Sequence, residues 1–352
     1  MSAQVPNGLA QPLADAAAAI QASQTIVLAC HVNPDGDALG SMLGLALALL
    51  PLGKTLTCLS EDGVPAILTF LPGAELVHQT TDQTEFDLAL VVDSGDLPRV
   101  GSTVQPVIGR ARRVVDIDHH VTSGAFGDIR VLDARAASTA EIVYALLLTL
   151  QAPITPQIAT CLFTGILTDT GSFRFQNVTP NTLTVAAALL EAGAPPAFIS
   201  EQVFENRTFA ATQLLGCALA SLQKTPDGKI VWAQITARNF AETHATDQDT
   251  EGIVSYVRGV QNTEVGILFR EMAGGGVRVS LRSRDTVNVA EIAAQFGGGG
   301  HKMASGCTVN LPLADAEKAV IQAVQSTGTG SAGLLSGESV SDTEDEATVA
   351  SL

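Results

Sequence analysis

The segment "HVNPDGD", residues 31–37, places one histidine and two aspartates within seven residues of chain. It directly follows the apolar run "TIVLAC", so these side chains start where a buried strand is expected to end. Pro34 and Gly36 are also ordinary turn residues, and a solvated turn alone would explain them. Similar segments elsewhere in the chain are needed to distinguish a chemical site from a turn.

Three other segments contain the same kinds of side chain. They are "VVDSGD" with Asp93, "DIDHH" with Asp118, His119 and His120, and "GILTDTGSF" with Asp169. Carboxylates gathered at one place repel one another unless cations are present. Imidazole and carboxylate ligands suit Mn, Mg, Fe or Zn, and two such ions roughly 3.5–4 Å apart can activate water for in-line attack on phosphorus. The residues therefore predict a phosphoester hydrolase with a pair of divalent metal ions.

The elements that must position these side chains predict a doubly wound α/β domain. Short apolar runs at residues 25–30, 88–92 and 113–117 indicate buried parallel strands, and each is followed at once by Asp or His. Ligands of such domains bind at the carboxyl ends of the strands. We therefore expect all four segments at strand ends or in loops along one edge of the sheet.

Helical patterns lie between and after these strands. Residues 38–50 form one predicted helix, and residues 138–150 form another, in which Ser138 and Glu141 match a capping box. Alternation of short apolar runs with helices is typical of a parallel sheet covered by helices on its faces.

A second, smaller α/β domain with a mixed sheet is expected later in the chain. The segments "KIVWAQIT", "EVGILFREM" and "GVRVSLRS" alternate like half-buried antiparallel strands, and glycines form the turn between the last two. The glycines of "FGGGGHKMASG", residues 296–306, allow backbone amides to approach an anion closely. Arg282 and Arg284 share one face of the predicted strand, where a guanidinium could bind phosphate or stack on a base. A plain flexible loop and a solvated arginine remain the alternative.

These patterns divide the chain into four parts. We expect a catalytic domain at 1–190, a helical linker at 191–215, a substrate-binding domain at 216–325 and a disordered acidic tail at 326–352. The tail is rich in Ser, Gly, Thr and acidic residues, a composition that cannot bury enough apolar surface to fold.

Composition excludes several classes of protein. The net charge of -17 disfavours a protein that coats long nucleic acid, because such affinity comes mainly from lysine and arginine. Five scattered cysteines without a C-x-x-C pair favour neither a disulfide framework nor a thiolate zinc site. The chain lacks a stretch of about 18 uninterrupted apolar residues and the basic N-terminal region of a secretory signal. We therefore expect a cytoplasmic protein with no membrane partner.

Taken together, these motifs resemble those of the DHH phosphoesterase family with a C-terminal DHH-associated domain. The family motifs are "DHH" at 118–120 with "HVNPDGD", "VVDSGD", "TDTGSF" and "GGGGHKMASG". The resemblance covers residues 10 to 325 or so and is strongest to the nano-RNases, which are bifunctional oligoribonucleases and 3′-phosphoadenosine-5′-phosphate (pAp) phosphatases. It implies two divalent metal ions, with manganese as the expected metal.

The resemblance also implies a role for each site residue. His31 and Asp35 would bind the first ion, and Asp93 would bridge both ions. The residues implied to complete the second ion are Asp37, His119 and Asp169.

Other residues would act on the substrate or support the ligands. Asp118 would orient its neighbours, as metal sites commonly require, and His120 would face the substrate phosphate. The residues implied to bind the terminal phosphate or nucleotide are Arg282, Gly299, Gly300, His301 and, as a weaker candidate, Arg174.

The expected activity is hydrolysis of very short oligonucleotides or dinucleotides to 5′-mononucleotides, with pAp phosphatase activity as a second reaction. The expected partners are short RNA or DNA oligonucleotides, dinucleotides and pAp, but no long duplex. A cyclic-dinucleotide phosphodiesterase could use the same residues. From another class, a non-catalytic nucleotide sensor stays open, as do both a monomer and a homodimer.

Overall fold

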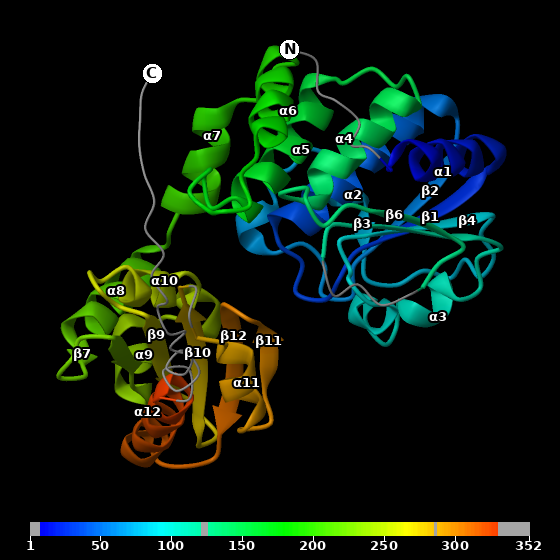
Figure 1. Cartoon of the computed structure of the whole chain (residues 1–352). Helices are drawn as coiled ribbons and strands as arrows, with labels where there is room; N and C mark the ends of the chain where they lie inside the picture. Colours follow the sequence, from blue (N-terminus) through cyan, green and yellow to red (C-terminus); the bar gives the residue numbers. More distant parts are fainter. Residues whose placement is uncertain (1–7, 121–125, 285–286, 330–352) are drawn as a thin grey trace, which may run out of the picture. The chain divides into compact units, whose positions relative to one another are not determined.

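The computed structural model describes residues 8–120, 126–284 and 287–329. The chain divides into two compact units between Asn206 and Arg207, and each unit is described by itself below (Figure 1). The expected acidic tail lies outside the described residues from residue 330 onward, whereas residues 326–329 belong to the last helix.

The first unit contains a parallel sheet, as the sequence predicts. Its strands are β1 (Thr25–Ala29), β2 (Thr55–Leu59), β3 (Val77–His78), β4 (Leu88–Val92), β5 (Val114–Asp118) and β6 (Ile129–Leu132). Within the described residues the order is β3-β2-β1-β4-β5-β6, and all neighbouring strands pair in parallel. The strand order therefore reverses between β1 and β4, which is where ligands of open α/β sheets bind.

Helices cover both faces of this sheet, and alternate residues of each strand point to opposite faces. Ile26 and Leu28 of β1 pack into the larger core, whereas Val27 and Ala29 pack into the smaller one. The helices on the larger side are α1 (Ala10–Ala22), α2 (Gly36–Leu49), α4 (Thr139–Thr149), α5 (Pro156–Asp169), α6 (Pro180–Glu191) and α7 (Pro196–Ser200). The other side is covered by α3 (Gln105–Ile108) and the short helical turn Leu97–Val100, below the sheet in Figure 1.

Helices α2 and α5 pack closely because α2 presents a glycine at every fourth position. A Cβ atom added at Gly40 would lie 2.4 Å from the carbonyl oxygen of Cys161, and one added at Gly44 would lie 2.8 Å from Cδ2 of Leu162. Gly36, at the start of α2, faces Thr168 near the end of α5 in the same way. The two helices therefore run antiparallel, and the start of one meets the end of the other.

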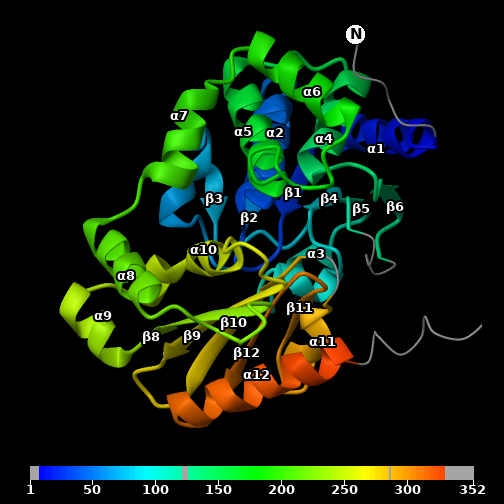
Figure 2. The same cartoon turned by 60° about the vertical axis from the view of Figure 1, so that its left-hand side comes forward.

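The second unit contains a mixed sheet, again as predicted. Its strands are β7 (Gln223–Lys224), β8 (Ile230–Ile235), β9 (Val265–Glu271), β10 (Val277–Ser283), β11 (Gly299–His301) and β12 (Ala304–Val309), in the order β11-β12-β10-β9-β8-β7 among the described residues. Helices α11 (Val289–Ala294) and α12 (Leu313–Thr329) pack on one face, and α8 (Phe209–Ala220) and α10 (Ile253–Arg258) pack on the other (Figure 2).

One expectation about this sheet is wrong. Strand β9 pairs with β10 in an antiparallel hairpin, but it pairs with β8 in parallel. The segment between β8 and β9 contains α9 (Ala237–Thr243) and α10. This crossover brings the chain back to the end of the sheet where β8 starts, so that β9 can run parallel to β8. All but the last residue of β9 are buried, so alternation alone did not describe it.

In the part of the chain that the structure describes, no single helix is long and apolar enough to cross a membrane. Residues Pro180–Glu191 and Pro196–Glu205 reach that length and apolarity only as a pair, and they are bent by 115°. Both segments contribute to the core of the first unit, through Leu189 and Ile199 for example.

We predict that Gly40→Ala lowers the free energy of unfolding by about 1–3 kcal/mol, because a methyl group there would overlap the Cys161 carbonyl oxygen. Urea denaturation followed by circular dichroism measures the change. Gly216→Ala in α8 is the matched control, since a Cβ atom there meets no heavy atom within 4 Å among the described residues. A Gly40→Ala protein as stable as that control would contradict the close packing of α2 on α5.

Candidate metal centre

The predicted site residues of the first unit gather at the carboxyl ends of β1, β4 and β5. His31 follows β1 by two residues, Asp93 follows β4 directly, and His119 and His120 follow β5. This edge contains the point between β1 and β4 where the strand order reverses.

Asp169 reaches the same place from a different kind of element. It was expected at a strand end or in a loop, but it is the last residue of the 14-residue helix α5. A short apolar run such as "GILT" does not distinguish a strand from a buried helix. The close contact of α5 with α2 places Asp169 near Asp37, the second residue of α2.

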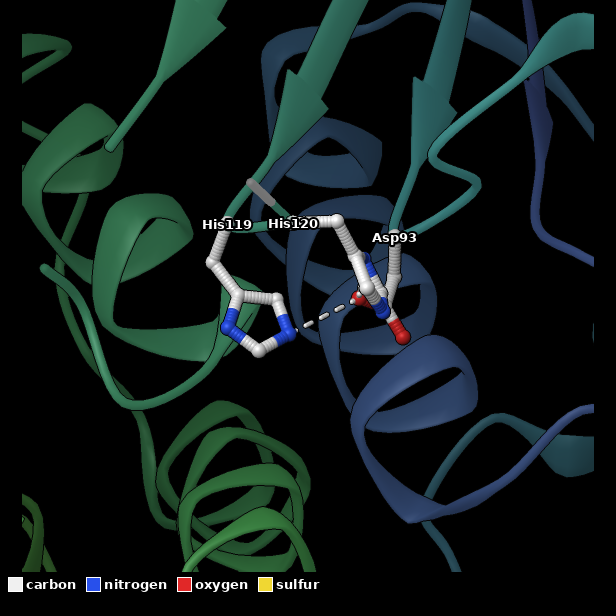
Figure 3. A group of neighbouring side chains, drawn as sticks. All are labelled: Asp93, His119 and His120. Atoms are coloured by element: carbon white, nitrogen blue, oxygen red, sulfur yellow. Dashed lines mark ion pairs between the residues drawn. The ribbon is translucent and has the colours of Figure 1, made fainter. Parts of the chain in front are cut away.

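Asp93 lies between two imidazoles and offers one carboxylate oxygen to each. Its Oδ2 lies 3.5 Å from Nε2 of His31, and its Oδ1 lies 3.5 Å from Nε2 of His119. Figure 3 shows both His119 and His120 turned toward Asp93 from the end of β5. The carboxylate is buried, and its residue has a left-handed backbone with φ of 56°. Such backbone conformations are uncommon outside glycine and cluster at functional sites.

His31, Asp35 and Asp93 form one group of three potential ligands. Their ligand atoms all lie within 4.8 Å of one another. The ring of His31 is oriented by a 2.8 Å contact between Nδ1 and the Val32 carbonyl oxygen, in which Nδ1–H is the donor. That tautomer leaves the Nε2 lone pair facing the carboxylates. Asp35 also caps α2 by accepting hydrogen bonds from two backbone amides.

His119, Asp37 and Asp169 form a second group. Nε2 of His119 lies 3.2 Å from Oδ2 of Asp169 and 4.0 Å from Oδ2 of Asp37. The ligand atoms again lie within 4.8 Å of one another. Because Asp93 Oδ1 faces His119, the Asp93 carboxylate connects this group to the first one.

Asp37 is held by the start of α4. Its Oδ2 accepts the backbone N–H of Thr139 at 2.6 Å, and its Oδ1 accepts that of Ala140 at 2.9 Å. The expected capping box is therefore wrong: Ser138 Oγ has no partner among the residues that the structure describes, and Glu141 accepts from the Ala137 amide instead. The Asp37 carboxylate of α2 therefore caps the start of α4, where Ser138 and Glu141 were expected to form the cap.

Thr139 is a site residue that the sequence did not reveal. Its hydroxyl donates to Asp93 Oδ1 at 2.9 Å, which fixes the carboxylate between the two histidines. In the sequence it is indistinguishable from an ordinary first residue of a helix. Only the packing of α4 against the sheet edge shows its role.

Burial dominates the electrostatics of both groups. Burial and the neighbouring carboxylates raise the pKa of Asp93 and of Asp169 well above the usual range, and raise that of Asp37 to about 7. Burial and the charge of His120 lower the pKa of His119 to about 4, so His119 is a neutral ligand at pH 7. The described side chains thus leave the carboxylates short of positive charge, as a site for divalent cations requires.

His120 pairs with Asp118 and also faces Asp93. Its Nδ1 lies 3.6 Å from Asp93 Oδ1, and the ligand atoms of Asp93, His119 and His120 lie within 4.8 Å of one another. Nδ1–H of His120 donates to Asp118 Oδ1 at 2.7 Å, and the same oxygen accepts the amides of His119 and His120. Burial alone would lower the pKa of His120, but the hydrogen bond to Asp118 and the charges of Asp93 and Asp118 outweigh it, and the pKa is raised. Asp118 therefore orients the two histidines without facing the groups itself.

The other predicted residues are not members of these groups. Arg282, Gly299 and Gly300 line a cavity of about 650 Å³ in the second unit, together with Arg270 and Arg278, which the sequence did not single out. His301 is the last residue of β11, and its side chain lies outside the description. Arg174 follows α5 in the first unit, where its Nε donates to the Gly171 carbonyl oxygen at 2.6 Å.

Comparison with known proteins assigns both units. Residues 25–166 match the DHH family N-terminal domain, and residues 227–327 match the DHHA1 domain. A bifunctional oligoribonuclease and PAP phosphatase, NrnA, from Thermus thermophilus is 38% identical over 302 residues, 85% of this chain and 89% of that protein. A probable protein of the same name from Streptococcus mutans is 31% identical over 82% of this chain and 91% of its own length.

Solved structures agree with this assignment. An exopolyphosphatase-related protein from Bacteroides fragilis has a TM-score of 0.87 and 25% identity, with 92% of this chain and 99% of that chain covered. RecJ from Thermus thermophilus shares the fold, with a TM-score of 0.53 and 17% identity over 91% of this chain and 55% of that one. Fold and relatives define a phosphoesterase. The chain belongs to the DHH family, with a DHH domain followed by a DHHA1 domain.

We predict that Mn²⁺ raises the melting temperature of the metal-depleted wild-type protein but not that of Asp93→Asn. Without metal, the Asp93→Asn protein should melt no lower than wild type, because the substitution removes a buried carboxylate whose pKa is raised by burial. Differential scanning fluorimetry of EDTA-treated protein measures both effects. Asp82→Asn, at an exposed position of the same unit, is the control. If Mn²⁺ raised the melting temperatures of Asp93→Asn and Asp82→Asn equally, the result would contradict the interpretation of Asp93 as a metal ligand.

We also predict that this gain in melting temperature is larger at pH 8 than at pH 5.5. A carboxylate whose pKa is raised on folding binds its proton more tightly in the folded state, so it destabilises the metal-free protein as the pH rises toward about 7 for Asp37. Metal ions compete with these protons and restore the lost stability at high pH. The same fluorimetry across pH tests this, and a gain that shrinks as the pH rises would refute it.

Proposed function

We propose that this protein is a metal-dependent phosphodiesterase that hydrolyses very short oligonucleotides and dinucleotides to 5′-mononucleotides and also hydrolyses pAp. The observation that carries the proposal is the buried Asp93 carboxylate, which offers one oxygen to each of two ligand groups. The names of the relatives from Thermus thermophilus and Streptococcus mutans support the substrate class.

The chemistry of the donor set fits two divalent ions. We assign His31 and Asp35 to one ion and Asp93 to both, and the remaining ligands of the other ion are Asp37, His119 and Asp169. Carboxylate oxygens with one imidazole per ion suit manganese, whereas metals that prefer thiolate ligands would find no cysteine in this set. When bound, such ions supply activated water and neutralise the charge that develops on phosphorus.

The protein's own groups position the reactants. Thr139 and the amides at the start of α4 hold two of the carboxylates in place, so the ligand oxygens need little reorganisation. Asp118 fixes the ring of His120 through Nδ1, and we assign Nε2 of His120 to the substrate phosphate, where it donates to the leaving oxygen.

The cavity of the second unit would bind the nucleotide. Its volume of about 650 Å³ is in the range of small-molecule sites, and Arg282 provides a charged donor suited to phosphate. A small cavity on a protein of net charge -17 favours short substrates over long strands.

We predict rapid release of mononucleotides from a 5′-phosphorylated dinucleotide and from pAp in the presence of Mn²⁺. Asp93→Ala should lose at least about 100-fold in rate, because it removes a ligand of both ions, whereas Asp82→Asn should retain wild-type activity. Long single-stranded RNA, cyclic di-AMP and pyrophosphate complete the panel.

Other results of the panel would favour a different function or contradict the proposed metal ligands. Preferential hydrolysis of cyclic di-AMP would make the protein a cyclic-dinucleotide phosphodiesterase that uses the same residues. Nucleotide binding without turnover of any member would make it a sensor, and fast hydrolysis by Asp93→Ala would contradict the metal assignment.

A further inference from the structure

Two arginines face each other across the hairpin of the second unit. Arg270 on β9 and Arg278 on β10 are register partners in the antiparallel pair. Like charges directly opposite each other on neighbouring strands are destabilising. Both side chains line the cavity that also contains Arg282 and the glycine segment. Their placement costs stability, and an anion in the cavity would relieve that cost.

The surrounding carboxylates compensate this pair only in part. Among the described residues, Asp247 pairs with both arginines: its Oδ1 lies 2.8 Å from Nη1 of Arg270, and its Oδ2 lies 3.0 Å from Nη1 of Arg278. The Asp247 side chain is 56% exposed, so solvent weakens its field. One partly solvated carboxylate therefore faces two guanidinium groups.

Arg270 is buried and retains an unused donor. It is 8% exposed, and its Nε has no hydrogen-bond partner among the described residues. Its Nη atoms donate to Thr250 and Ser280. Burial, with Arg278 close by, lowers the pKa of this guanidinium, which nevertheless stays charged. A buried, charged donor that lines a cavity is suited to an oxyanion.

The pair lies at a different end of the cavity from Arg282. Arg278 and Arg282 are four residues apart on one face of β10, which corresponds to about 13 Å along the strand. Arg278 is held by Asp247, and Nη1 of Arg282 donates to the carbonyl oxygen of Leu281 at 3.0 Å. The two guanidinium groups are therefore held apart by different partners.

Small residues form the floor between these two ends. Ser280 lies midway on β10, opposite Gly306 of β12, which in turn is opposite Gly299 of β11. Figure 2 shows β10, β12 and β11 side by side. Because Ser280, Gly306 and Gly299 have small side chains or none, this part of the floor has room for a base or a sugar.

We propose that Arg270 and Arg278 form a second phosphate subsite, so that the cavity binds a stretch of nucleotide strand with one phosphate at each end. The inference rests on the proposed function. A substrate that places two phosphates in this cavity and has a third phosphate at the bond to be hydrolysed carries three phosphates in all. A 5′-phosphorylated trinucleotide has three, whereas pAp has two. The subsite therefore favours trinucleotides and longer oligonucleotides over pAp.

The test is the ratio of kcat/KM for the 5′-phosphorylated trinucleotide pApApA to that for pAp, measured on the full chain with Mn²⁺. Arg278→Gln should lower this ratio about tenfold, because it removes one charge-assisted contact to phosphate. Asp247→Asn should raise the ratio, because it releases both arginines to the substrate. Arg284→Gln is the control, since Arg284 is exposed beyond the end of β10 and outside the residues that line the cavity.

Two results would overturn the subsite. One is an Arg278→Gln ratio equal to that of Arg284→Gln. The other is a fall in the ratio for Asp247→Asn as well as for Arg278→Gln, which would show that the ion pairs merely stabilise the sheet.

Direct binding separates the subsite from the proposed function. Fluorescence anisotropy of labelled pApApA with Asp93→Asn, alone and combined with Arg278→Gln, measures binding without turnover. About tenfold weaker binding of the double variant supports the subsite even if wild type hydrolyses nothing, a result that would contradict only the proposed function. Equal binding overturns the subsite whatever the activity.

Discussion

The arrangement of the first unit depends on one constraint, which is that the carboxylate of Asp93 is buried. A charge removed from water needs partners, and here the partners come from the ends of β1 and β5 on either side of β4. The parallel strand order brings these ends together at one edge. The glycines of α2 allow α5 to approach and add Asp169 to the same place. The left-handed backbone of Asp93 and the glycine at every fourth position of α2 are local features of the chain, and both help to form the same site.

The same edge explains why α4 begins without a side-chain cap of its own. The amides at a helix start have no partner within the helix, and they carry partial positive charge. The Asp37 carboxylate accepts hydrogen bonds from two of these amides. The same two hydrogen bonds therefore cap α4 and balance part of the negative charge of Asp37. Neutralisation remains incomplete, since burial still raises the pKa of Asp37. The two amides thus stabilise the Asp37 carboxylate in part, and the remaining negative charge of the cluster suits a divalent cation.

Local pattern was sufficient for β1, β4 and β5 and for most of the clustered residues, but it did not identify β2, β3 and β6. Apolar runs that end in Asp or His identify β1, β4 and β5, and the carboxyl ends of parallel strands meet on one edge. Three features depended on tertiary contacts that a single sequence does not encode in its spacing. Asp169 belongs to a helix, β8 pairs with β9 in parallel, and Arg270 faces Arg278 only because the hairpin fixes that register. Register and helix packing decide these positions, and neither leaves a periodic signal.

The two units have opposite local imbalances of charge. Among the described residues, burial and neighbouring carboxylates raise the pKa of Asp93 and Asp169 in the first unit, whereas Arg270 and Arg278 in the second share one partly exposed carboxylate, Asp247. The net charge of -17 repels a polyanion at long range, and screening confines favourable attraction to roughly 8 Å at physiological salt. A long strand would extend beyond the reach of Arg270, Arg278 and Arg282, and its remaining phosphates would be repelled by the net negative charge of the chain. A short phosphorylated substrate needs no contacts beyond that reach, so the charge distribution agrees with the short substrates that we propose.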